Sequence, residues 1–332
     1  MRRLLAPYLT TDGTDNSDGY CQSSSLSVVI CEICGSFHRG STLFVVATSG
    51  RQNWLRLQLQ TGYSRMKKGA RSELSLLVES LMSGDIKAVR AQLQRAASVQ
   101  VRLPQRKNRP ARETPLMLAA ERGHLPIVRL LISLGTNINE TNEFRQPPLL
   151  YAVRENQVST VNLLLKSGAD PNLVMVDGDF VLREACTSSI DLRICRTLLK
   201  FGADPCFANK MGGTALHIAA FHGRADVARA LIRAGANVNH RDRHGHGPLT
   251  CAISRNHENV ATLLLQNGAD PRLQPEALGI AAWEGHLRFV EMLIENGWDV
   301  HSKSHQGRTP LQHARNRKHK SVIIALIDAE AN

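Results

Sequence analysis

The sequence predicts an all-α solenoid of helix-turn-helix-hairpin units, preceded by an N-terminal leader that we expect to be largely disordered. Three observations support this prediction. Aromatic residues make up only 5% of the chain, so Leu, Ala, Ile and Val should fill the core, and these suit helices better than strands. From Glu73 onward, apolar residues recur at three- and four-residue spacings. Related segments also return at a nearly fixed period, which is the signature of a solenoid.

Residues 1–71 differ from the rest of the chain, and we interpret them as a low-order basic leader and linker. Residues 1–112 carry 17 Lys and Arg against 7 Asp and Glu, whereas residues 113–332 are nearly neutral. The apolar runs 27–31 and 42–47 could be strands, but two strands alone are marginal, so we expect no sheet. Three Asp residues soon after the first apolar run argue against a signal peptide.

Residues 72–112 predict a degenerate N-terminal capping repeat followed by a basic loop. Apolar residues have helical spacing on both sides of Ser83-Gly84, which indicates two helices separated by a tight break. The loop 101–112 then carries several Arg residues and a Lys.

Seven related units occupy residues 113–332. They start at Thr114, Pro147, Phe180, Thr214, Gly247, Glu276 and Thr309, with separations of 33, 33, 34, 33, 29 and 33 residues. The short step of 29 residues before Glu276 predicts that one projecting hairpin is missing there. The row of hairpins should therefore be interrupted at that point.

The recurring strings resemble those of ankyrin repeats. The unit at Thr214 contains Thr-Ala-Leu-His, then Ala-Ala at 219–220 and Gly-Ala-Asn-Val-Asn at 235–239, and a Gly-His slot recurs in other units. The resemblance covers residues 73–332. It implies stacked helix pairs that bind other proteins through a concave face made by the hairpin tips and the first helix of each pair. No single unit can bury its apolar side alone, so neighbouring units must stack.

The resemblance also indicates which residues contact a partner. The two positions before the Gly-His slot should face the concave side, and the hairpin tips should project beside them. We expect contacts from seven residues at these positions: Phe144, Arg154, Met175, Met211, Phe221, Arg255 and Trp283. Exposed aromatic and Arg residues are typical of interface hot spots, and an exposed apolar stripe usually marks an interaction site. The alternative is that Phe221 and Trp283 pack sideways on the next unit and that neighbouring tips cover one another.

Asn139 and Asn239 each end a hairpin entry, with Leu131 and Leu231 eight residues earlier. This pattern resembles the substrates of an asparaginyl hydroxylase, which makes both Asn residues candidates for hydroxylation. The favoured alternative is an Asn that only forms hydrogen bonds within the hairpin.

We predict no enzyme, no catalytic residue and no cofactor. The sequence contains no G-x-S-x-G motif and no P-loop. Four His residues recur in the Gly-His slot, which favours packing and hydrogen bonding over catalysis: His124, His257, His286 and His319.

We also expect no bound metal. Cys31, Cys34 and His38 would supply three zinc ligands where four are needed, and we favour free thiols in the leader. A second group, His240, His244 and His246, is interpreted as a solvated hairpin tip. The odd total of seven Cys residues argues against a disulfide framework.

These observations predict a monomeric, non-catalytic adaptor in the cytoplasm, the nucleus or both, which binds proteins as partners. No apolar run approaches the roughly 18–20 residues that a membrane helix needs. One alternative is a nuclear regulator whose basic N-terminal part contacts nucleic acid, although its basic stretches lack interleaved aromatic residues. Another is a substrate-recognition adaptor of a larger complex such as a ubiquitin ligase, although we expect no SOCS-box-like tail after the last unit.

Overall fold

The structure is a computed structural model that describes residues 20–23, 26–29, 68–95, 101–104, 110–270, 272–304 and 307–331. The chain divides into two units, residues 1–73 and 74–332. In the first unit, strand β1 (Tyr20–Ser23) pairs antiparallel with β2 (Leu26–Val29). The expectation that no sheet forms in the leader is therefore wrong, because β2 finds its partner in the preceding residues. The run 42–47 and the expectation of a largely disordered leader lie outside the described residues.

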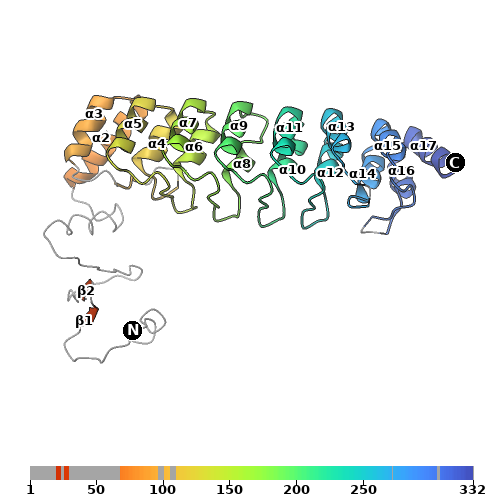
Figure 1. The fold of residues 1–332 in the computed structure, drawn as a ribbon, viewed down its shortest axis with the longest axis horizontal. Coiled ribbons are helices and arrows are strands. Elements are labelled where there is room, and N and C mark those ends of the chain that lie inside the picture. The colour runs from red at the N-terminus through yellow and green to blue at the C-terminus, as the bar shows by residue number, and fades with distance from the viewer. Residues whose placement is uncertain are drawn as a thin grey trace. The chain divides into compact units, whose positions relative to one another are not determined.

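The second unit is a row of helix pairs (Figure 1). We call the first helix of each pair an inner helix: α2 (Lys68–Ser83), α4 (Pro115–Arg122), α6 (Pro148–Arg154), α8 (Val181–Glu184), α10 (Ala215–Phe221), α12 (Pro248–Ser254), α14 (Glu276–Glu284) and α16 (Pro310–Arg317). The second is an outer helix: α3 (Ile86–Arg95), α5 (Leu125–Ser133), α7 (Val158–Lys166), α9 (Leu192–Lys200), α11 (Ala225–Arg233), α13 (Glu258–Gln266), α15 (Leu287–Glu295) and α17 (Lys320–Ala331).

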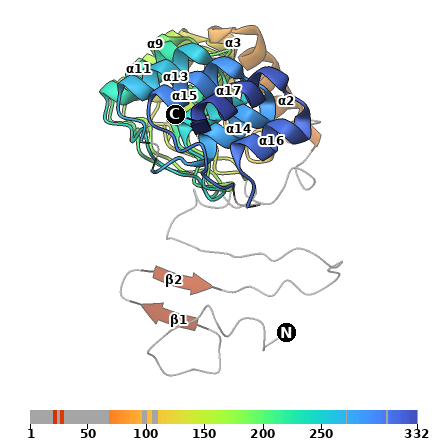
Figure 2. The ribbon, with the colours of Figure 1, turned by 90° about the vertical axis from the view of Figure 1, so that its right-hand side faces the viewer.

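Each layer stacks along the row. Among the inner helices, α10 contacts α12 and α14 contacts α16, while α7, α9 and α11 contact one another in sequence in the outer layer. Figure 2 views the stack from its C-terminal end, with the two helix layers side by side and the connecting loops projecting from one edge. The predicted all-α solenoid is confirmed for this unit.

The unit that begins at Thr214 shows why the sequence folds this way. Thr214 is the extended N-cap of α10, and the ring of His217 accepts a hydrogen bond from the Thr214 N–H at Nδ1 (3.2 Å). Ala219 and Ala220 are fully buried, because their small side chains let adjacent helices pack closely. Gly235 ends the outer helix region with a φ of 98°, a left-handed conformation that Gly adopts without strain.

The Gly-His slot links three units to the unit that precedes each of them. Ring Nε2 atoms of His124, His257 and His319 lie 3.2, 3.1 and 3.0 Å from the backbone oxygens of Met82, Phe221 and Trp283. The interpretation of these three His residues as structural is therefore confirmed. His286 follows the shortened step and instead contacts the Phe289 ring, with 5.8 Å between centroids.

We expect Gly223→Ala to lower the free energy of unfolding by about 2–3 kcal/mol, because it combines backbone strain with a clash. Gly223 has a φ of 69°, and a Cβ atom there would lie 2.5 Å from Nδ1 of His257. Gly235 is the control, since its φ is also left-handed but a Cβ would meet nothing within 4 Å. Urea unfolding should show a loss of only about 1 kcal/mol for Gly235→Ala. Equal losses for the two variants would contradict a tight inter-unit contact at His257.

The hairpin row is interrupted, as the sequence predicts. Residues 234–247 link α11 to α12, whereas the shorter segment 267–275 links α13 to α14. Two buried side chains cover the shortened segment. Gln274 Nε2 donates to Asn239 Oδ1 (3.1 Å), and Trp298 Nε1 donates to the backbone carbonyl oxygen of Gln274 (2.9 Å). Among the described residues, no helix has the length and apolar character to cross a membrane.

Candidate partner-binding surface

Two aromatic residues lie at the C-terminal ends of inner helices, each beneath an Arg of the next unit. Phe221 is the last residue of α10, and the Arg255 guanidinium lies 4.0 Å from its ring centroid. Trp283, near the end of α14, is covered by Arg317 in the same way at 4.4 Å. We call these the capped aromatic pairs. The guanidinium attracts the negative face of the ring and holds it in a fixed orientation.

The rings of the capped aromatic pairs are both packed against the next unit and partly exposed, so each of the two interpretations made from the sequence is partly right. Each ring contacts the next unit, as the sideways alternative states, but Phe221 remains 37% exposed and Trp283 is half-buried. Arg317 is missing from the predicted contact residues, although it occupies the same repeat position as Arg255. The repeat register was therefore a signal that could have identified it.

Basic side chains flank the Phe221 ring of the first capped aromatic pair. His222 lies edge-on to the Phe221 ring, with 5.3 Å between centroids. Partial burial lowers the pKa of His222, and the neighbouring His257 and Arg255 lower it further. Further along the row, the exposed Arg154 ends α6, and its Nε lies 3.5 Å from an Oε of Glu184. Such an exposed ion pair adds little to stability, so Arg154 can exchange it for another partner.

The hairpin tips place two predicted residues at the surface and one in the interior. Phe144 is 49% exposed and Met211 is 50% exposed. The prediction that Met175 is an exposed contact residue is wrong, because its side chain is only 4% exposed. Met175 N donates to the Asp179 oxygen (2.9 Å) as the first residue of its turn, the role that Asn142 has in the previous hairpin. Side chains at this turn position point inward, and Asn142 is buried too.

Val176, next to Met175, takes the surface position instead. It is 51% exposed, and its N–H donates to the Phe144 oxygen in the neighbouring hairpin (3.1 Å). We call Phe144, Val176 and Met211 the tip stripe. It presents apolar side chains on three consecutive hairpins, which is the arrangement expected of an interaction site.

The predicted hydroxylation residues belong to a hydrogen-bond ladder between hairpins. Asn139 Nδ2 donates to the Gly168 oxygen (3.1 Å), and its Oδ1 accepts from Asp170 N (2.9 Å). Asn239 makes the equivalent bonds to Gly268 (2.8 Å) and Asp270 (2.9 Å). The alternative, an Asn that forms hydrogen bonds in the hairpin, therefore describes both residues. Hydroxylation of Asn139 or Asn239 stays a prediction.

Two groups of Cys and His residues were weighed against a metal site in the sequence, and no metal is expected at either. Cys31, Cys34 and His38 lie outside the described residues. On the hairpin tip, the His244 and His246 rings lie 6.2 Å apart. Over the described ranges, no group of three or more His, Cys, Asp or Glu side chains is arranged to hold a metal ion.

Stacked helix pairs with projecting hairpins define a repeat solenoid. A family model described as ankyrin repeats (3 copies) matches residues 74–175 and 182–275, and one described as ankyrin repeats (many copies) matches 281–327. The chain belongs to the ankyrin repeat family. Ankyrin repeats are in general protein–protein interaction modules built on a non-enzymatic scaffold.

Individual relatives agree with this assignment. The chain is 30% identical to the B-cell lymphoma 3 protein homolog of Mus musculus over 218 residues, which is 62% of this chain and 49% of the relative. It is 33% identical to the Homo sapiens B-cell lymphoma 3 protein over 219 residues, 62% of this chain and 48% of the relative. The chain thus spans about half the length of these relatives.

A solved structure is similar as well. The crystal structure of the human ASB11 ankyrin repeat domain superposes with a TM-score of 0.58 at 27% identity. The match covers 65% of this chain and 98% of that domain.

Proposed function

We propose that the chain is a monomeric, non-catalytic adaptor, in the cytoplasm, the nucleus or both, that binds partner proteins across two surfaces. One is formed by the capped aromatic pairs and Arg154 at the inner-helix ends, and the other is the tip stripe. The observation that carries the proposal is the repeated geometry of Phe221–Arg255 and Trp283–Arg317, at 4.0 and 4.4 Å, on a chain with few aromatic residues.

The chemistry of these surfaces suits a protein partner. A partly exposed aromatic ring supplies a large apolar area with few rotatable bonds, and the Arg above it adds hydrogen-bond donors at its rim. Such residues dominate binding energy when a partner excludes water from them. The tip stripe adds apolar contact area on the projecting hairpins, and all three of its side chains are about half exposed.

The partner is best identified by placing a photo-crosslinking residue at Phe221 in the full chain and analysing the products by mass spectrometry. Position Ile324, which is 60% exposed on the outer helix α17, serves as the control. We expect proteins that crosslink from position 221 and not from position 324. Identical products from both positions would contradict the proposed surface.

Affinity for the crosslinked partner should then fall about 100-fold or more in the double variant Phe221→Ala/Trp283→Ala, since each ring is placed as a hot spot. Circular dichroism and the unfolding midpoint establish that the variant is folded. Arg255→Glu is a second variant with an exposed side chain, and it should weaken binding without altering the core. Unchanged affinity in both variants would refute the proposal, while Ile324→Ala should bind like the unmodified chain.

A further inference from the structure

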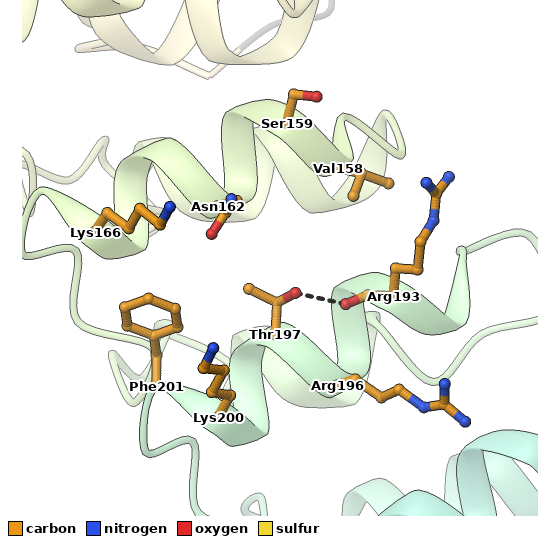
Figure 3. Close-up of a pocket in the computed structure, with 9 residues that line it drawn as sticks. All are labelled: Val158, Ser159, Asn162, Lys166, Arg193, Arg196, Thr197, Lys200 and Phe201. Atoms are coloured by element: carbon orange, nitrogen blue, oxygen red, sulfur yellow. Dashed lines mark hydrogen bonds between the residues drawn. The ribbon is translucent and has the colours of Figure 1, made fainter.

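Two neighbouring grooves lie between outer helices, away from the surfaces described above. The first, of about 450 Å³, lies between α7 and α9, and the second, of about 380 Å³, lies between α9 and α11. Figure 3 shows the first groove, where Lys166 of α7 and Lys200 of α9 reach toward the space between the two helices. Arg196 and Lys200 line both grooves, so the grooves adjoin across α9.

A row of cations crosses these grooves. Lys166, Lys200 and Arg233 are the last residues of α7, α9 and α11, so they occupy one repeat position in three consecutive units. We call these three residues the cation row. Arg196 and Arg229 lie one helical turn earlier on α9 and α11. All five side chains are exposed, which places five positive charges along one continuous surface.

These five cations are not neutralised within the described part of the chain, where no carboxylate lies within 4.0 Å of them. Two nearby carboxylates, of which Asp226 lines the second groove, each pair with another Arg. Asp191 pairs with Arg193 (2.8 Å) and Asp226 pairs with Arg224 (3.1 Å). A ligand that brings negative charge to the grooves therefore meets cations that have no competing ion pair among these residues.

The fold does not require cations at this position. A positive charge is favourable at a helix C-terminus, because it interacts with the helix dipole. Yet the same repeat position is Ser133 in α5, Gln266 in α13 and Glu295 in α15. From α5 to α15, the cations at this position thus occur only in three neighbouring units, the same units that form the grooves.

Apolar side chains lie between the charges in both grooves, and the first groove is also lined by the polar Ser159, Asn162 and Thr197. Val158 and Phe201 line the first groove, and Leu199 and Ala230 line the second, and all four are half-buried. A ligand with apolar groups between its negative charges fits this lining. A nucleic acid fits it less well, because Phe201 is the single aromatic side chain that lines either groove and successive bases need a series of rings.

The spacing expected between residues of the cation row favours one backbone conformation of the ligand. Neighbouring helices pack about 8–10 Å apart, so the cations should recur at about that interval. In a polyproline II helix every third residue faces the same way, at intervals of about 9 Å. In a β-strand the residues on one face recur at only about 7 Å. We propose that the outer grooves bind an acidic, proline-rich segment of a partner protein in polyproline II conformation, with a carboxylate at every third residue and the intervening prolines over the groove floors.

The test uses the full chain and a fluorescent peptide of four Glu-Pro-Pro repeats, with affinity followed by fluorescence anisotropy. The triple variant Lys166→Gln/Lys200→Gln/Arg233→Gln should bind the peptide about tenfold or more weakly. The control variant Lys87→Gln/Arg90→Gln/Arg95→Gln removes the same charge from exposed positions of α3 and should keep the affinity. Phe221→Ala/Trp283→Ala should also keep it, which separates this proposal from the proposed function.

A second peptide tests the spacing. Four Glu-Pro repeats carry the same charge at a different interval and should bind more weakly than the Glu-Pro-Pro peptide. Equal affinity for the two peptides, or equal losses in the two triple variants, would overturn the proposal in favour of a non-specific electrostatic attraction. Tighter binding of a single-stranded RNA of matched charge would overturn it as well. So would failure of the peptide to bind while sedimentation shows a dimer that the cation-row variant dissociates.

Discussion

Trp298→Ala is expected to lower the free energy of unfolding of the C-terminal helix pairs by about 3–5 kcal/mol. The indole is only 3% exposed, so its loss leaves a cavity. The substitution also removes the hydrogen bond from Nε1 to the backbone carbonyl oxygen of Gln274, which lies in a segment too short to form a hairpin. At the equivalent position, two other units carry a buried Ala, namely Ala203 and Ala236. The hairpin that precedes each of these two units has its full length. The large Trp298 side chain thus packs where the shortened segment leaves out a hairpin.

Hydrogen exchange followed by mass spectrometry is the appropriate measurement, because repeat arrays need not unfold in a single step. Exchange should accelerate in α14, α15, α16 and α17 and much less in α4 and α5. Trp298→Phe keeps most of the ring and removes the hydrogen bond, so it should cost about 1–2 kcal/mol. A Trp298→Ala variant as stable as the unmodified chain would show that the indole does not support this site.

Stability should also fall as the solution is acidified from pH 6.5 toward pH 4, because of His217. Its ring is buried, with Nδ1 2.8 Å from Thr214 Oγ1 and Nε2 3.2 Å from the His246 oxygen. Burial lowers the pKa of His217 from 6.5 to about 4. Between these values the unfolded chain binds a proton that the folded chain does not. The stabilisation from a neutral His217 is therefore fully present above pH 6.5 and is lost as the pH falls. The loss of unfolding free energy reaches about 3 kcal/mol near pH 4.

Another unit of the chain shows which substitution at His217 serves as the matched control. In the last unit, Gln312 occupies the same repeat position as His217, and its Oε1 accepts a hydrogen bond from Thr309 N (3.0 Å). His217→Gln should therefore keep the helix cap while removing the titrating ring. Urea unfolding at pH 7, 5.5 and 4 should show the unmodified chain losing stability relative to the variant at each step. Parallel curves for the two proteins would contradict a buried neutral His217.

The repeat period predicted most of the fold, and the physical reason is that each unit must present the same apolar face to its neighbours. That requirement preserves strings such as Thr-Ala-Leu-His and makes the missing hairpin visible as a short step. Residues that obey no such requirement were harder to place. Met175 and Val176 are both apolar, and only the alignment of their turn with Asn142 decides that the first is buried and the second exposed.

The outer grooves could not be predicted from the concave positions alone. Lys166, Lys200 and Arg233 lie more than thirty residues apart in sequence, and each looks like an ordinary solvated charge at a helix end. Stacking of α7, α9 and α11 brings them into a row. Comparing one position across all units, instead of reading each unit separately, would have revealed the run of cations followed by Gln266 and Glu295.

The short segment covered by Gln274 and Trp298 also affects how a ligand can lie along the row of hairpins. A straight ligand that follows them toward the C-terminus meets a notch after residue 247, and the next finger, residues 296–309, lies beyond it. A ligand that lies along the hairpins makes no hairpin contact over residues 267–275, because this segment is too short to project. The surface that the hairpins present is therefore divided into two stretches, one on each side of this segment.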